Sequence, residues 1–266
     1  MTVTPSARPA FTIRVVPALH VDEDQGDDPL IVLVHGSMDR GATFRRVRTA
    51  LHGHHVIAYD RRGYAGSVGA RPIATTLDDH VEDLIAVIDA RPAVVAGHSY
   101  GADVALAAAI ERPDLILAVV AYEPPMPWAP WWPTDSAGGA AIAAAAAHAD
   151  PGDAAEAFMR AIVGDDVWDR LPPSTKDLRR MDGPALVAEM ESIREPPAPF
   201  DPSRVPVPVI VATGSDSPDR FADSTRALAS VIPGARLEVV ADASHGCHLS
   251  HPELFAGLVR DALALT

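Results

Sequence analysis

Residues 93–101 read Ala-Val-Val-Ala-Gly-His-Ser-Tyr-Gly, an apolar run that leads directly into a serine with a glycine two residues away on each side. The run of small and β-branched residues predicts a buried strand, and the alanine-rich segment 100–110 predicts a helix. A serine on a sharp turn between a strand and a helix holds its hydroxyl outside the sheet, which is a setting typical of a nucleophile. The two glycines keep side chains out of the space where strand and helix approach each other. The stretch therefore predicts a nucleophilic Ser99.

The sequence on both sides of this stretch alternates between strand and helix patterns. Such alternation is typical of a mainly parallel sheet that is covered by helices on both faces, so the predicted fold class is α/β. Thr76 is a candidate N-cap for one of these helices, whose apolar residues share one face. The expected strands are 11–16, 30–34, 55–59, 93–96, 116–122, 207–212 and 236–240, and the expected helices are 42–51, 77–90, 100–110, 221–231 and 252–265.

The alternation is interrupted once. Residues 123–133 are too rich in proline for a helix or a central strand. Residues 137–195 then show only helical patterning, at about 140–149, 154–162 and 183–193, and a second proline-rich segment, 195–208, follows. We therefore expect an α/β core made of residues 1–122 and 204–266, with residues 123–203 inserted as a helical cap.

The composition limits the class of protein. The 266 residues, 48% of them hydrophobic, suit one α/β domain with an insertion. The formal charge of −14 argues against nucleic acid and anionic membranes as partners. No apolar stretch is long enough to span a bilayer, and residues 1–21 lack the apolar segment of a signal peptide. With a single cysteine, Cys247, no internal disulfide can form, so we expect a cytoplasmic monomer or homodimer that acts on a small molecule.

A nucleophilic serine needs an adjacent base, and the C-terminal part of the chain offers one. His245 follows the last expected strand on a short loop, at the edge of the sheet where Ser99 is expected. His248 and His251 compete with it. His248 is expected to order the loop or pack, and His251 directly precedes the proline that begins the terminal helix. His245 is therefore the predicted base.

The base must be held in one tautomer by an acid, for which the chain offers three candidates. Asp216 follows the strand expected at 207–212, so it lies at the same edge of the sheet as the nucleophile. Asp219 is in the same loop, where a bulge would exchange the two carboxylates. Glu123 ends the strand before the insertion. Asp216 is the predicted acid, with Asp219 and Glu123 as alternatives.

Acyl transfer also needs N–H donors for the charge that develops on the carbonyl oxygen. One is expected from Tyr100, the residue after the nucleophile, and the other from the loop after strand 30–34. In that loop Gly36 lets the backbone turn inward, so the N–H of Ser37 is the expected donor and Met38 the alternative. The apolar side chains near these groups either bind a hydrophobic substrate or pack the cap onto the core. They are Met38, Tyr100, Met126, Trp128, Trp131 and Trp132.

Taken together, these residues resemble the α/β-hydrolase superfamily over nearly the whole chain. The resemblance implies an eight-stranded, mostly parallel sheet and the chain order serine, acid, histidine. One departure is the spacing Gly214-Ser215-Asp216, which is shorter than the G-x-x-D of many members. The matching pieces are 35–38, 59–64 with 66–67, 97–101, the Asp216 loop, and His245 with 248–249.

The chain is most similar to small bacterial esterases, lactonases and C–C hydrolases with a cap after the sixth strand. This implies a serine hydrolase that cleaves a carboxylic ester or lactone through an acyl-enzyme, without a metal or cofactor. Epoxide hydrolases and haloalkane dehalogenases of this fold use aspartate as the nucleophile, and Ser99 argues against both. Three alternatives that keep the same residues are a C–C hydrolase, a thioesterase or cyclase, and a cofactor-free perhydrolase. A further alternative is a non-catalytic small-molecule binding protein.

Overall fold

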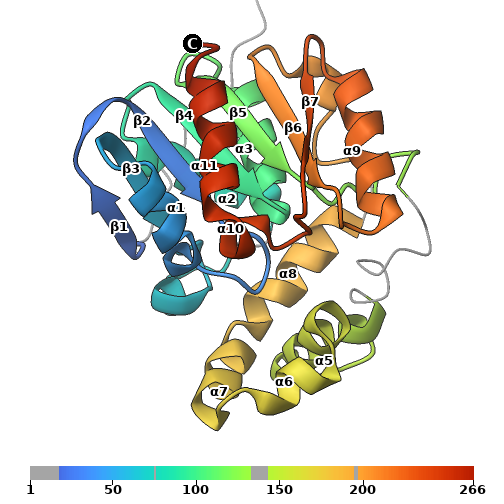
Figure 1. Ribbon diagram of the computed structural model, residues 1–266. Helices are drawn as coiled ribbons and strands as arrows, with labels where there is room; N and C mark the ends of the chain where they lie inside the picture. Colours follow the sequence, from blue (N-terminus) through green and yellow to red (C-terminus); the bar gives the residue numbers. More distant parts are fainter. Residues whose placement is uncertain (1–17, 75, 133–142, 195–196) are drawn as a thin grey trace, which may run out of the picture.

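The fold is an α/β sandwich around one twisted sheet (Figure 1). The computed structural model describes residues 18–74, 76–132, 143–194 and 197–266. In these residues seven strands pair in the order β1-β3-β2-β4-β5-β6-β7, and only β1 runs antiparallel to its neighbour. The α/β class with a mostly parallel sheet is confirmed. The strands are β1 (Val21–Asp24), β2 (Asp27–Val34), β3 (His54–Tyr59), β4 (Ala93–His98), β5 (Ile116–Tyr122), β6 (Val209–Gly214) and β7 (Arg236–Val240).

The sheet differs from the expected one at its N-terminal end. The strand expected at 11–16 lies outside the described residues, and β1, which pairs with β3, was not expected. The prediction missed β1 because Val21–Asp24 is a short, mostly exposed edge strand in which the last three of the four residues are acidic, so it shows no apolar alternation. The described sheet therefore has seven strands where eight were expected.

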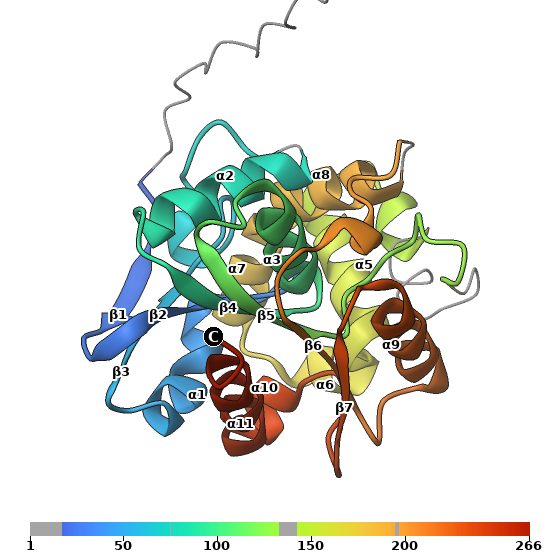
Figure 2. The ribbon, with the colours of Figure 1, turned by 90° about the horizontal axis from the view of Figure 1, so that it is seen from above.

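Helices cover both faces of the sheet, as Figure 2 shows from above. Alternate residues of the central strands point to opposite faces. Leu30 and Val32 belong to one apolar cluster, with residues of α2, α3 and α9, whereas Ile31 and Leu33 belong to a second cluster, with residues of α1 and α11. Thr76 is the N-cap of α2, as predicted, and the structure adds a reciprocal capping box with Asp79. These helices are α1 (Arg45–Ala50), α2 (Leu77–Ile88), α3 (Tyr100–Glu111), α9 (Asp219–Val231), α10 (Cys247–Ser250) and α11 (Pro252–Leu263), with 3-10 turns η1 (Gly41–Phe44), η2 (Ala65–Ser67) and η3 (Pro202–Arg204).

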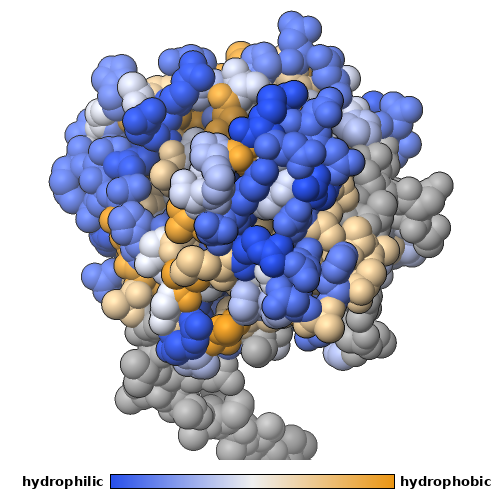
Figure 3. All heavy atoms as spheres, turned by 90° about the horizontal axis from the view of Figure 1, so that it is seen from below, coloured by the Kyte–Doolittle hydropathy of each residue, from blue (hydrophilic) through white to orange (hydrophobic). Residues whose placement is uncertain are grey.

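Between β5 and β6 the chain forms a separate group of helices, which we call the cap helices. Figure 1 shows them below the sheet, and in Figure 3 that side of the molecule is mostly hydrophilic with scattered apolar residues. The helix expected at about 140–149 lies partly outside the described residues, and the domain boundaries at 123 and 203 stay a prediction. No described helix is both long and apolar enough to cross a membrane. The cap helices are α5 (Pro151–Val163), α6 (Asp165–Arg170), α7 (Pro173–Met181) and α8 (Gly183–Arg194).

Candidate active site

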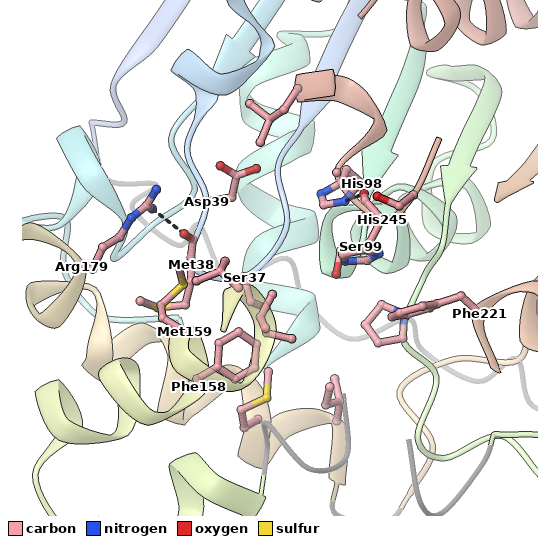
Figure 4. Close-up of a pocket in the computed structure, with 18 of the residues that line it drawn as sticks. Ser37, Met38, Asp39, His98, Ser99, Phe158, Met159, Arg179, Phe221 and His245 are labelled. Carbon is pink, nitrogen blue, oxygen red and sulfur yellow. Dashed lines mark hydrogen bonds between the residues drawn. The ribbon is translucent and has the colours of Figure 1, made fainter. Parts of the chain in front are cut away.

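Ser99 lies on the turn between β4 and α3 in a strained backbone conformation. Its φ of 53° and ψ of −130° are rare for a residue with a side chain. The sheet holds this conformation, because the Ser99 N–H donates to the carbonyl of Tyr122 at 2.9 Å. A Cβ on Gly101 would overlap the carbonyl oxygen of Val34, so only glycine lets α3 begin this close to β2. The turn directs the Ser99 side chain into a cavity (Figure 4).

His245 reaches the same cavity from the loop between β7 and α10. Two core side chains hold that loop by its backbone: His98 Nε2–H donates to the His245 carbonyl at 2.7 Å, and the Tyr122 hydroxyl donates to the Ser244 carbonyl at 2.8 Å. The ring of Phe221 stacks on the imidazole, with centroids 4.7 Å apart and an interplanar angle of 16°. Ser99 and His245 therefore lie together at one end of the cavity, as Figure 4 shows.

Glu123 is the carboxylate that contacts His245. Its Oε2 accepts a hydrogen bond from His245 Nδ1–H at 2.7 Å, while its Oε1 accepts from the Thr213 hydroxyl at 2.6 Å and the Gly214 N–H at 3.1 Å. Burial by itself raises the pKa of Glu123, but the hydrogen bonds from His245 and Thr213, with the charge of His245, outweigh it. The pKa is held below its usual value, so this buried group stays an anion beside the imidazole.

The expectation that Asp216 holds His245 is wrong for this structure. Asp216 is exposed, and its Oδ1 accepts from the Ser215 hydroxyl at 3.1 Å. Asp219 is also exposed, at the first position of α9. Register explains the difference: Tyr122 pairs with Ala212, so Glu123 stands level with Thr213 at the edge of the sheet. Asp216 lies three residues farther along, beyond that edge.

The loop after β2 brings the expected oxyanion donors to Ser99. A Cβ on Gly36 would come within 2.8 Å of the Ser99 Cβ, so this loop passes directly against the nucleophile. His35 braces the loop: its Nδ1–H donates to the Gly36 carbonyl at 2.7 Å, and its Nε2 accepts from the Arg61 N–H at 2.9 Å. Burial and the charge of Arg61 lower the pKa of His35 to about 3, which keeps it neutral. Ser37 lies in the turn that follows and lines the cavity.

The cavity has a volume of about 410 Å³ and a mostly apolar lining. Among the residues expected to bind substrate, Met38 and Trp132 line it. Four others are not among its lining residues: Tyr100 and Met126 are buried, Trp128 packs edge-on against Phe200 at 5.5 Å, and Trp131 is half-buried against the core.

Most of the apolar lining comes from cap residues that sequence reasoning missed. Phe158 and Ile162 are one helical turn apart on α5, and so are Met159 and Val163. Met190 and Ile193 supply the corresponding face of α8. The sequence shows the i, i+4 spacing of the α5 residues, but it does not show that this face of the helix lines the cavity.

One group of side chains has ligand types and spacing that suit a metal ion. Among the described residues, Asp39, His98 and His248 each offer a ligand atom, and these atoms lie within 4.8 Å of one another. In this structure His248 Nε2–H donates to Asp39 Oδ2 at 3.1 Å, and His98 is engaged with the His245 loop.

Comparisons with known proteins agree with this architecture. A model described as "Alpha/beta hydrolase family" matches residues 31–258. An epoxide hydrolase of Caballeronia sordidicola is 38% identical over 114 residues, which are 41% of this chain and 34% of that protein. Lipase LipV of Mycobacterium tuberculosis is 36% identical over 110 residues, 40% of this chain and 41% of that protein. The chain thus matches only 34% and 41% of the length of these curated relatives.

A solved structure shares nearly the whole fold. The enol-lactonase of Burkholderia xenovorans superposes with a TM-score of 0.70, covering 93% of this chain and 97% of that one, at 22% sequence identity. At this identity the likeness is one of fold.

Proposed function

Because the chain belongs to the α/β-hydrolase family, we propose that it is a serine hydrolase that cleaves a carboxylic ester or lactone of a small apolar substrate. The observation that carries the proposal is the 2.7 Å hydrogen bond between His245 Nδ1 and buried Glu123, with Ser99 in the same cavity. This bond leaves His245 Nε2 as the basic nitrogen.

The proposed reaction is a two-step acyl transfer. Ser99 Oγ attacks the carbonyl carbon while His245 Nε2 takes the hydroxyl proton, and Glu123 stabilises the imidazolium that results. The backbone N–H groups of Ser37 and Tyr100 bind the oxyanion of the tetrahedral intermediate. Its collapse breaks the C–O bond as His245 returns the proton to the leaving alcohol. A water molecule then attacks the acyl-enzyme in the same way and releases the acid and free Ser99.

The lining of the cavity and the names of the relatives support the proposed substrate class. A lining dominated by Phe158, Ile162 and Met190 favours an apolar acyl or alcohol group. The names lipase and enol-lactonase of the similar proteins fit an ester or a lactone. The similar epoxide hydrolase does not change the proposal, because hydrolases of that class in this fold use an aspartate where this chain has Ser99.

A fluorophosphonate probe tests the activated serine. We expect the wild-type protein to be labelled, Ser99→Ala to lose all labelling, and Ser215→Ala, which replaces an exposed serine outside the cavity, to be labelled as the wild type is. Hydrolysis of p-nitrophenyl esters of increasing chain length and of a lactone panel then measures the substrate class. A folded wild-type protein that neither reacts with the probe nor hydrolyses any of these substrates would exclude the proposal.

A further inference from the structure

The cap helix α8 carries a buried carboxylate that the proposed acyl transfer does not use. Glu189 is 2% exposed and meets four groups of the core. Its Oε2 accepts from the hydroxyls of Ser37 and Tyr64, both at 2.7 Å, and its Oε1 pairs with the guanidinium of Arg61 and lies 3.3 Å from His80 Nε2. The charge of Arg61 holds the pKa of Glu189 well below its usual range despite the raising effect of burial, so the group is an anion. One side chain of the cap therefore binds the loop that contains Ser37.

The second expected oxyanion residue is held from the same helix. The Tyr100 hydroxyl lies 3.3 Å from Ser192 Oγ, and Ser192 is one turn along α8 from Glu189. The guanidinium of Arg61, fixed by Glu189, lies 4.9 Å above the Tyr100 ring. Both residues whose N–H groups face the carbonyl oxygen in the proposed reaction are thus tied by their side chains to α8.

A third contact reaches the same loop from α7. Arg179 donates to the carbonyl oxygen of Met38, the residue after Ser37. Met38 has a φ of 57°, a left-handed conformation that is strained for a residue with a side chain and persists only where its surroundings hold it. The cap side chains supply that support on both sides of the Ser37–Met38 peptide.

We propose that Glu189 is a positioning residue that sets the oxyanion hole from the cap, through the Ser37 hydroxyl and through Arg61. The proposal rests on the acyl transfer proposed above. Donors stabilise an oxyanion only when they are already oriented before the charge develops, because reorientation during the reaction costs free energy. Ser37 lies in a turn rather than in a strand or helix, so its orientation depends on such side-chain contacts.

Glu189 has a structural role as well, and the test must separate the two. Arg61 is fully buried, and removal of the charge beside it leaves an uncompensated cation. The first variant is therefore Ser37→Ala, which removes the hydroxyl but keeps the Ser37 N–H and the Arg61–Glu189 pair. The second is Glu189→Gln. Glu191→Gln is the matched control, because Glu191 is an exposed carboxylate on the same helix.

The experiment measures ester hydrolysis together with binding of a trifluoromethyl ketone, which Ser99 converts into a hemiketal oxyanion. Outright loss of an oxyanion donor lowers kcat by about 10²–10³, so a displaced donor is expected to lower it by roughly ten-fold. We expect that fall in kcat for S37A and E189Q with KM nearly unchanged, an equal fall in ketone affinity, and no change for E191Q. The double variant S37A/E189Q should lose less than the product of the two single losses, because the residues act through one contact.

Each outcome bears on the proposal. Folded S37A and E189Q proteins with wild-type kcat and ketone affinity would overturn it, and so would a change confined to KM. If E189Q does not fold, as judged by circular dichroism, S37A alone decides. If the proposed hydrolase function is wrong, the result is different, because the wild-type protein itself would then not react with the fluorophosphonate probe.

Discussion

At the scale of single residues, the candidate site is built from strained positions at the ends of adjacent strands. Ser99 after β4 and Glu123 after β5 both have left-handed φ values, 53° and 47°, although neither is glycine. Such conformations cost of order 1–3 kcal/mol each and persist where the surrounding structure enforces them. Here the sheet enforces both: Ser99 N–H donates to Tyr122, and Glu123 N–H donates to Ala212 at 3.0 Å.

The identity of the acid gives the first prediction. Glu123→Gln keeps the size of the side chain but removes the charge that stabilises the His245 imidazolium, and kcat for ester hydrolysis should fall by about 10²–10⁴. Asp216→Asn, which alters an exposed carboxylate, should stay within about two-fold of the wild type. Steady-state kinetics on one p-nitrophenyl ester compares the two. A larger fall in kcat for Asp216→Asn than for Glu123→Gln would identify Asp216 as the acid.

At the scale of elements, helices α2 and α5 have separable roles. Helix α2 packs with α3 on one face of the sheet and begins with a reciprocal capping box. Helix α5 has one face against the cavity, and residues of its last turns, including Ile162, line it. Helix α2 is expected to affect stability, and helix α5 is expected to affect substrate selectivity. Variants in the two helices should therefore change different measurements.

Loss of the α2 cap should destabilise the fold without altering the site. Thr76→Ala removes the side-chain acceptor of the Asp79 N–H, and we expect the free energy of unfolding to fall by about 1 kcal/mol. Thr49→Ala, at an exposed position in the last turn of α1, should change it by less than about 0.5 kcal/mol. Urea denaturation measures both. Equal effects would show that the capping box contributes nothing specific.

Narrowing the cavity from α5 should change the preferred chain length. Ile162→Trp places a larger side chain in the lining, so kcat/KM for a long-chain ester should fall at least about five-fold more than for the acetate ester. Val167→Trp is the matched control, because Val167 and Ile162 are both 43% exposed but Val167 is not among the lining residues. A shift of equal size in both variants would mean that the substrate does not lie along α5.

At the scale of the whole molecule, buried charges join the cap to the core. Asp182, between α7 and α8, accepts from the Ala65 N–H at 3.0 Å and lies 3.5 Å from the guanidinium of Arg40. It is 1% exposed, and burial raises its pKa to about 6 against the lowering effects of Ala65, Arg40 and Arg179. The ionised form of Asp182 therefore disfavours the folded state.

This junction makes stability depend on pH. The pKa of Asp182 in the folded state lies above its value in the unfolded state. The protonated carboxyl group therefore contributes stability that is fully present below about pH 4 and is lost as the pH rises through about 6. Asp182→Asn removes this loss. The unfolding free energy of the variant minus that of the wild type should therefore rise by roughly 2 kcal/mol between pH 4 and pH 7. Urea denaturation at a series of pH values measures the difference, and a flat difference would contradict the assignment.

The sequence by itself determined the α/β class, the elements around residues 93–101 and the cap of α2. These depend on local patterns: apolar runs, helical periodicity, and an N-cap residue directly before an amphipathic helix. The sequence also placed Ser99 and His245 as candidates, because both follow expected strands at one edge of a parallel sheet. It left three carboxylates open as the acid, since each follows a strand or lies in a loop at that edge.

Only the tertiary structure shows which of them contacts His245. Glu123 and His245 are 122 residues apart, and their contact depends on the register of β5 with β6 and on the path of the His245 loop. Ser37 and Glu189 are 152 residues apart, and no local pattern relates the cap helix to the loop after β2. Patterns along the chain report the direction and burial of backbone segments. Contacts near 3 Å between distant side chains depend instead on how strands align and how the cap packs, and these are properties of the folded molecule.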